Sequence, residues 1–162
     1  MLAMMREYKL REMYLPKMPG LAKAFYVHLS LTKKYLPKLH THMLVQKFEP
    51  SMYASQWFMT IFSVNMPFEC IVRIWDIFFV EGPKMMYRVA LAIFKINQEK
   101  LLKADLDGLF TKLREYSKGA EPELLIKTAV SFTFSKDLIA KLEKEFEESP
   151  DPELNKYCIM WG

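Results

Sequence analysis

The chain has 162 residues and a formal net charge of +4, and 51% of its residues are hydrophobic. That length suits one domain with a buried core, and the few glycines (5) and prolines (9) exclude collagen-like and low-complexity classes. The two cysteines, Cys70 and Cys158, are too far apart in sequence to indicate a disulfide framework or a metal pair, which favours a reducing compartment. We expect Cys70 to be a small buried hydrophobic residue.

Positive charge is concentrated in the N-terminal third. Residues 1–50 hold 9 Lys or Arg against 3 Asp or Glu, whereas residues 101–162 hold 9 against 12. Such an excess can face an acidic protein or a lipid surface, and it is more often an ordinary solvated face. The cations are dispersed and accompany no recognised nucleic-acid motif, so we expect no nucleic-acid partner.

Proline marks the start of several predicted helices, because its missing N–H costs nothing in the first turn and its fixed φ suits a helix. These prolines are Pro37, Pro50, Pro67, Pro83 and Pro122. After Pro50 the apolar residues recur at helical spacing and predict one buried face. After Pro67 and Pro83 they run nearly all round, so we expect these two helices to be central.

Three amphipathic helices are predicted downstream, within residues 106–113, 124–129 and 138–146, with Lys and Glu on their outer faces. No segment alternates with period two for long enough to predict a strand. The sequence therefore predicts an all-α, bundle-like lobe of about 8–10 helices with no β-sheet. It occupies residues 1–148, and residues 149–162, which contain two prolines and little periodicity, form a tail.

An uncharged run from Pro50 to Phe68 approaches the length of a membrane span. Six polar residues interrupt this run and Pro67 closes it, so we expect no transmembrane helix. Residues 1–15 carry five charged side chains, which leaves no apolar core for a signal peptide. These features favour a cytoplasmic protein.

An arginine and two carboxylates interrupt the apolar helix predicted after Pro67. At 100° per residue, Glu69, Arg73 and Asp76 fall within an arc of about 60° and form one polar stripe. An unpaired buried charge is very costly, so we expect Arg73 to be paired within this stripe. A structural ion network is favoured here over a catalytic role.

Other candidate sites fail on spacing. The segment DLDG at Asp105 has its glycine two positions early for a calcium loop, with Tyr116 where a bidentate Glu is needed. His40 and His42 are two residues apart and point to different sides of a helix, which makes a poor metal pair. No P-loop, H-E-x-x-H or G-x-S-x-G motif occurs. We expect neither a metal nor a cofactor.

Two long stretches carry a family resemblance. PKLHTHMLVQKFEPSMYASQWFMTIFS, followed by PFECIVRIWDIFFVEGPKMMYRVALAIFK, resembles the C-terminal half of a TBC domain, the family of all-helical GTPase-activating proteins for Rab GTPases. The resemblance covers about residues 5–103. With Glu69 from the polar stripe, its structural signature comprises Tyr53, Trp57, Glu69, Arg73, Trp75, Asp76, Glu81 and Gly82.

Family catalysis uses two fingers upstream of this region, an arginine in I-x-x-D-x-x-R and a glutamine in Y-x-Q-G. In the family, the arginine stabilises charge on the transferring phosphoryl group and the glutamine orients the attacking water. Neither motif occurs in this chain. Gln56 lies in a different context, followed by Trp57, and Arg73 matches the family's structural R-x-W-D element. The resemblance therefore assigns no catalytic residue here, and we expect this chain alone not to be an enzyme.

The resemblance implies a lobe that contributes to binding a Rab-type small GTPase and supports the finger-bearing lobe. Gln56 and Asn65, near one end of the helix that holds Trp57, are the candidate partner contacts, although solvated helix ends are the commoner explanation. A competing hypothesis is a finger-less helical interaction module that binds a small GTPase or another protein without catalysis. A third is peripheral association with endomembranes through the basic N-terminal third, which predicts salt-sensitive binding to anionic vesicles.

Overall fold

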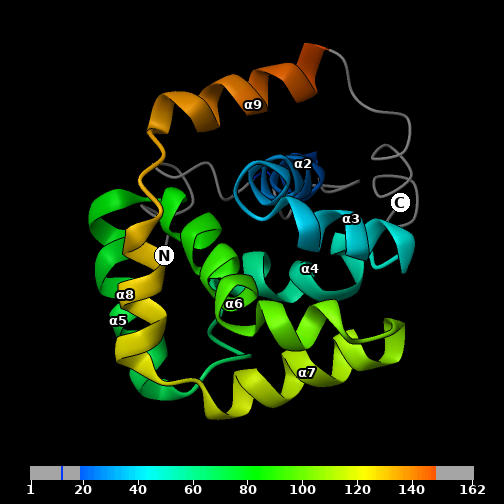
Figure 1. Ribbon diagram of the computed structural model, residues 1–162. Coiled ribbons are helices and arrows are strands. Elements are labelled where there is room, and N and C mark those ends of the chain that lie inside the picture. The colour runs from blue at the N-terminus through cyan, green and yellow to red at the C-terminus, as the bar shows by residue number, and fades with distance from the viewer. Residues whose placement is uncertain (1–11, 13–18, 149–162) are drawn as a thin grey trace.

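The computed structural model describes Glu12 and residues 19–148. Within that part of the chain it contains helices and no strand (Figure 1), so the all-α prediction is confirmed. The predicted tail, residues 149–162, lies outside the described residues. The helices are α2 (Pro19–Tyr35), α3 (Pro37–Val45), α4 (Pro50–Thr60), α5 (Phe68–Glu81), α6 (Lys84–Leu102), α7 (Leu106–Gly119), α8 (Pro122–Ser131) and α9 (Lys136–Glu148).

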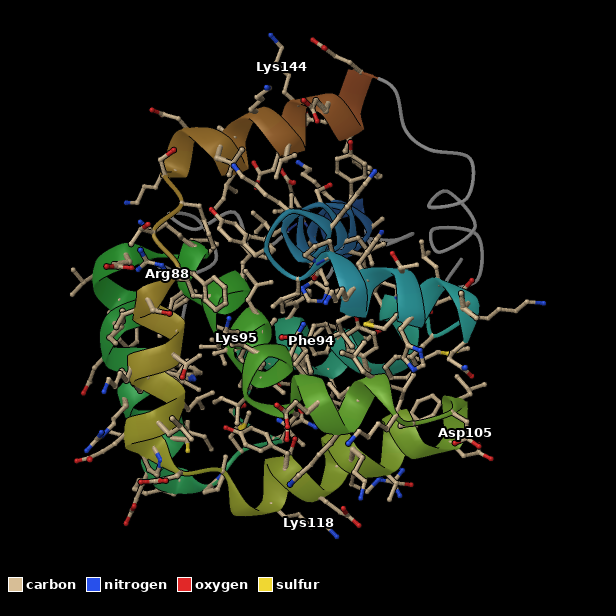
Figure 2. The ribbon with its side chains drawn as sticks, viewed as in Figure 1. Arg88, Phe94, Lys95, Asp105, Lys118 and Lys144 are labelled. Atoms are coloured by element: carbon tan, nitrogen blue, oxygen red, sulfur yellow. The ribbon has the colours of Figure 1, made fainter. Side chains whose placement is uncertain are left out.

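Helix α6 is the centre of the fold, as the sequence predicts. It packs against α2, α3, α5, α7 and α8 (Figure 1), and the ten residues after Lys84, from Met85 to Phe94, are all buried. Phe94 is fully buried and lies in the middle of the molecule (Figure 2). The buried polar residues of this helix are Arg88 and Asn97, whose side chains donate to the Glu81 carboxylate and the Ile93 carbonyl.

Helix α5 departs from the prediction. Only Cys70, Ile74 and Phe78 of this helix are buried, because α5 contacts the fold mainly along the side that faces α6 and α8. Its other side carries exposed apolar residues, namely Phe68, Val72, Phe79 and Val80. The expectation that α5 is central is therefore wrong, and a largely apolar helix lies at the edge of the molecule.

The remaining helices enclose α6. Helix α9 lies across α2, and α7 runs along the opposite side of the molecule (Figure 1). An ion pair between Lys23 and Glu147, 2.7 Å long, joins α2 to α9. Pro37, Pro50 and Pro122 occupy the first helical position, as predicted. None of the described helices is both long and apolar enough to cross a membrane.

Candidate functional site

The turn after α4 has an unusual backbone. Ile61 adopts φ 48° and ψ 50°, and Phe62 follows with φ 62°. The left-handed region is rarely adopted by residues other than glycine, and least by a β-branched residue such as isoleucine. Such conformations persist only where the surrounding structure fixes them, and they cluster at functional sites.

Buried hydrogen bonds hold this turn in place. The Phe62 backbone N–H donates to the Trp57 carbonyl at 2.9 Å, which closes the end of α4. The Trp75 indole N–H of α5 donates to the Ile61 carbonyl at 3.1 Å. Ile61 and Phe62 are themselves buried. Trp75, the tryptophan of the R-x-W-D element, therefore helps to fix the α4–α5 turn.

The same turn brings the two candidate contact residues together. The Asn65 side-chain Nδ2 donates to Gln56 Oε1 at 3.0 Å. Gln56 is exposed, and next to Asn65 the side chain of Val64 is 63% exposed. Asn65 Oδ1 is buried and has no hydrogen-bond partner. Gln56, Ser63, Val64 and Asn65, called the α4–α5 corner below, thus form a preorganised polar and apolar surface.

Two aromatic residues of the structural signature lie in the core. Tyr53 and Trp57 are nearly buried, and their rings lie 5.4 Å apart between centroids. The Tyr53 hydroxyl and His28 Nε2 share a hydrogen bond of 2.9 Å. Burial lowers the pKa of His28 to about 3, with nearby His40 adding to the effect, so the imidazole is neutral at physiological pH. This hydrogen bond joins α4 to α2 within the core.

Glu81 and Gly82 end α5 and join it to α6. Gly82 has φ 76°, a conformation that favours glycine, and its N–H donates to the Phe78 carbonyl at 2.7 Å. The Glu81 carboxylate accepts a hydrogen bond from the guanidinium of Arg88, which is buried and lies over the Phe134 ring. This ion pair fixes the turn and the angle between the two helices.

The polar stripe of α5 is solvated, contrary to the sequence prediction. Glu69, Arg73 and Asp76 are all exposed. The Arg73 guanidinium lies 4.0 Å from the Glu123 carboxylate of α8, and the two side chains are 47% and 81% exposed. A buried network with Glu69 and Asp76 is therefore wrong, because the stripe lies on the outer side of an edge helix where water solvates each charge.

The other sequence candidates have structural roles in the described residues. The Asp105 carboxylate accepts from the Gly108 N–H at 2.9 Å and caps α7, which accounts for the DLDG segment. His42 Nε2 bonds to the Ala104 carbonyl at 2.7 Å and ties α3 to the turn after α6. Cys70 is buried as expected, and burial raises the pKa of its thiol. The described residues contain no group of three or more potential metal ligands.

An open cleft of about 310 Å³ lies between the α5–α6 turn and α9. Its lining includes two carboxylates, Glu81 and Glu143, and two ammonium groups, Lys84 and Lys136. Charges of both signs therefore line the cleft, and one of its carboxylates, Glu81, already pairs with Arg88.

Sequence reasoning missed the left-handed turn and the exposed Val64. Ile61 and Phe62 look like ordinary helix residues in sequence, since their conformation depends on the distant Trp75 indole. Asn65 followed by Met66 and Pro67 was the only local signal of a turn.

Comparison with known proteins identifies the family. The family model described as Rab-GTPase-TBC domain matches residues 1–102. The mouse Ecotropic viral integration site 5 protein is 38% identical over 146 residues, which is 88% of this chain and 18% of that protein. The Schizosaccharomyces pombe GTPase activating protein Gyp51 is 30% identical over 152 residues, covering 88% of this chain and 15% of its own length.

A solved structure agrees with this match. The crystal structure of the Chlamydomonas flagellar RabGAP TBC domain superposes with a TM-score of 0.64 and 34% identity, covering 70% of this chain and 40% of that chain. The chain thus spans less than a fifth of the mouse and yeast relatives and less than half of the solved domain. On the family match and the shared helical fold, the chain belongs to the Rab-GTPase-TBC domain family.

Proposed function

We propose that the chain acts as the C-terminal lobe of a TBC-type GTPase-activating domain for Rab GTPases. In this role it contributes to Rab binding and supports the lobe that bears the catalytic fingers. The observation that carries the proposal is the match to part of a TBC domain, 40% of the solved chain, together with the absence of both finger motifs from this sequence. The Schizosaccharomyces pombe relative is named a GTPase activating protein and the family model is described as a Rab-GTPase-TBC domain, which supports a Rab-type partner.

The exposed side of α5 supports a second lobe. Phe68, Val72 and Phe79 fall within an arc of about 40° and, with half-buried Trp75, repeat at spacings of four, three and four residues. That pattern is typical of a helix face that packs on another element. Large exposed apolar surfaces are uncommon on isolated domains. We assign this α5 stripe to packing against the finger-bearing lobe.

The α4–α5 corner is the proposed Rab contact. The backbone directly before Ser63 is fixed in an uncommon conformation at Ile61 and Phe62, and the corner presents the Gln56 amide and the exposed Val64. An amide and an apolar side chain on a rigid turn suit a protein surface, because little conformational freedom is lost on binding. The unsatisfied Asn65 Oδ1 indicates a position where a donor from a partner or a water would fit.

A single-turnover assay of phosphate release tests the catalytic part of the proposal. The chain alone, mixed with a panel of GTP-loaded Rabs, should leave hydrolysis at the intrinsic rate, because an arginine finger alone contributes about a thousandfold or more. The same lobe joined to an upstream segment with both finger motifs should stimulate hydrolysis. Stimulation by the short chain would reveal a finger within it, with Arg73 and Gln56 examined first.

Binding of the same Rabs tests the contact surface. The double variant Gln56→Ala/Asn65→Ala should weaken Rab binding by about tenfold, whereas Gln98→Ala on α6, away from the corner, should leave it unchanged. Equal binding by all three proteins would remove the corner from the interface.

The competing function is a finger-less interaction module that binds a small GTPase or another protein without catalysis. The exposed α5 stripe favours it as much as it favours a missing lobe, because either partner would cover the same residues. The coding sequence upstream of Met1 discriminates between them. Both finger motifs there would support the TBC lobe, and a parent without them would support the module.

A further inference from the structure

Exposed basic and aliphatic residues lie at the end of α2, on α3 and in the turn that follows it. They are Lys33, Lys34, Lys38, Leu44, Val45 and Lys47, called the α3 surface below. Helix α3 lies at the edge of the molecule (Figure 1). The α3 surface is formed by other residues than the α4–α5 corner and the α5 stripe, so it is unused by the proposed Rab and lobe contacts.

The lysines of this surface lie in a stretch of the sequence that holds no carboxylate. The sequence contains no Asp or Glu from residue 13 to residue 48. Among the described residues, none of the four lysines forms an ion pair. His40, which lies among them, has its pKa lowered by burial and then by the charge of Lys33, so the local potential is positive.

The carboxylates that border the surface are already engaged. Glu49 is half-buried at the start of α4 and has interactions of its own. Asp105, labelled in Figure 2, follows the Ala104 carbonyl that binds His42, and its side chain caps α7. The positive charge of the α3 surface is therefore available to an external partner.

Two apolar side chains lie between these lysines. Leu44 and Val45, in the last turn of α3, are 62% and 70% exposed. On the helix, Lys38 and Val45 fall within about 20° of each other, so ammonium and apolar groups share one face. Lys47 follows in a left-handed turn, with φ 56°, whose N–H donates to the Leu44 carbonyl at 3.1 Å. The helix end thus presents apolar residues flanked by cations.

We propose that the α3 surface binds an anionic lipid membrane. Lysine ammonium groups beside exposed aliphatic side chains match the interface of such a bilayer, where the charges meet anionic headgroups and the apolar groups enter the acyl boundary. A purely acidic protein would use the lysines and leave Leu44 and Val45 in water, so lipid is favoured over protein. The α5 stripe is less suited to this role, because Glu69 and Asp76 flank it.

Co-sedimentation of the full chain with phosphatidylcholine vesicles, with and without phosphatidylserine, tests the proposal without any Rab. The chain should bind the phosphatidylserine vesicles at low salt and be released as salt rises. Each lysine near an anionic surface contributes about fivefold to partitioning, so Lys38→Gln/Lys47→Gln should reduce it about 25-fold. The matched control Lys118→Gln/Lys127→Gln removes two exposed lysines on α7 and α8 and should change it less than about twofold.

A second variant tests the apolar contribution. Leu44→Ser/Val45→Ser should reduce partitioning on the order of tenfold while leaving the melting curve unchanged, since both side chains are exposed. Leu124→Ser/Val130→Ser on α8 is its control. Three results would overturn the proposal. The chain could bind neutral and anionic vesicles equally, or the two lysine double variants could lose binding equally. In the third, Leu44→Ser/Val45→Ser would leave the partitioning unchanged and the chain would bind soluble polyglutamate as tightly as vesicles. The last would identify an acidic protein as the partner. None of these results depends on Rab binding.

Discussion

Helices α5 and α6 are both apolar nearly all round, yet they occupy different places in the fold. Helix α6 lies at the centre and buries Met85 through Phe94 without a break, whereas α5 lies at the edge and buries only three residues. A phenylalanine and an arginine from each helix illustrate the difference. Phe94 and Arg88 of α6 are buried, and Phe79 and Arg73 of α5 are exposed.

The difference shows that an apolar composition predicts that a helix will be covered, but it does not identify the segment or partner that covers it. Helix α6 meets that need within the described chain, through five neighbouring helices. Helix α5 does so on one side only, and Phe68, Val72 and Val80 on its other side are exposed. Matched substitutions in the two helices therefore measure where the lobe is complete and where it is not.

The largest effect is expected from Phe94→Ala. The Phe94 ring lies 5.3 Å from the His28 ring and 5.4 Å from the Tyr53 ring between centroids. The side chain is fully buried, so the substitution would leave a cavity in the core. Removing it should lower the free energy of unfolding by about 3–5 kcal/mol. Urea denaturation measures this. A loss below about 1 kcal/mol would show that α6 is not tightly packed.

Arg88→Met should have the next largest effect. Methionine keeps most of the packing against Phe134 and removes the charge, leaving the Glu81 carboxylate without its cation. Because the Glu81 side chain is 34% exposed, water compensates in part, and we expect a loss of about 2–3 kcal/mol. Glu81→Gln serves as the reciprocal variant. A small effect of both would mean that the α5–α6 turn is held by Gly82 alone.

The buried His28 predicts a specific pH dependence. Its pKa is about 3 in the folded protein and near the ordinary 6.5 when unfolded, so below pH 6.5 only the unfolded chain binds the proton. This group therefore does not reduce the free energy of unfolding above pH 6.5. As the pH drops below 6.5 the free energy of unfolding decreases, by about 2 kcal/mol at pH 5. Urea midpoints from pH 8 to pH 5 should show it. The variant His28→Gln should have a shallower slope, and an unchanged slope would assign the effect elsewhere.

Much of the fold could be predicted from the sequence, and most of the site could not. Proline positions and apolar spacing locate the helices, since both act within one or two turns. The placement of α5 depends on which other chain segments cover it. The residues around Val72 and Arg73 in the sequence do not indicate that these two side chains are exposed. The sequence predicted Gln56 and Asn65 as separate contact residues, without a hydrogen bond between them. Their mutual hydrogen bond depends on the left-handed Ile61, which is fixed by Trp75 from another helix.

Phe79→Ala tests the open side of the comparison. The Phe79 side chain is 50% exposed, and it contacts the Trp75 ring at 5.8 Å between centroids. Half the burial of a core phenylalanine predicts a loss of about 1 kcal/mol in the isolated chain, well below Phe94→Ala. If the finger-bearing lobe packs on the α5 stripe as proposed, the same substitution should cost more in a parent that carries that lobe. Equal losses in both proteins would place the lobe contact away from α5.

The smallest effect is expected from Arg73→Ala. Its guanidinium is 4.0 Å from the Glu123 carboxylate, both side chains are well exposed, and exposed ion pairs contribute less than about 1 kcal/mol. We expect a loss within about 0.5 kcal/mol, against about 2–3 kcal/mol for the arginine of α6. A double-mutant cycle with Glu123→Ala isolates the pair, and raising the salt concentration should remove what coupling it has. A loss of several kcal/mol for Arg73→Ala would mean that the polar stripe of α5 is covered in solution, for example by a second copy of the chain. Near-wild-type stability combined with weaker Rab binding would instead make Arg73 a contact residue.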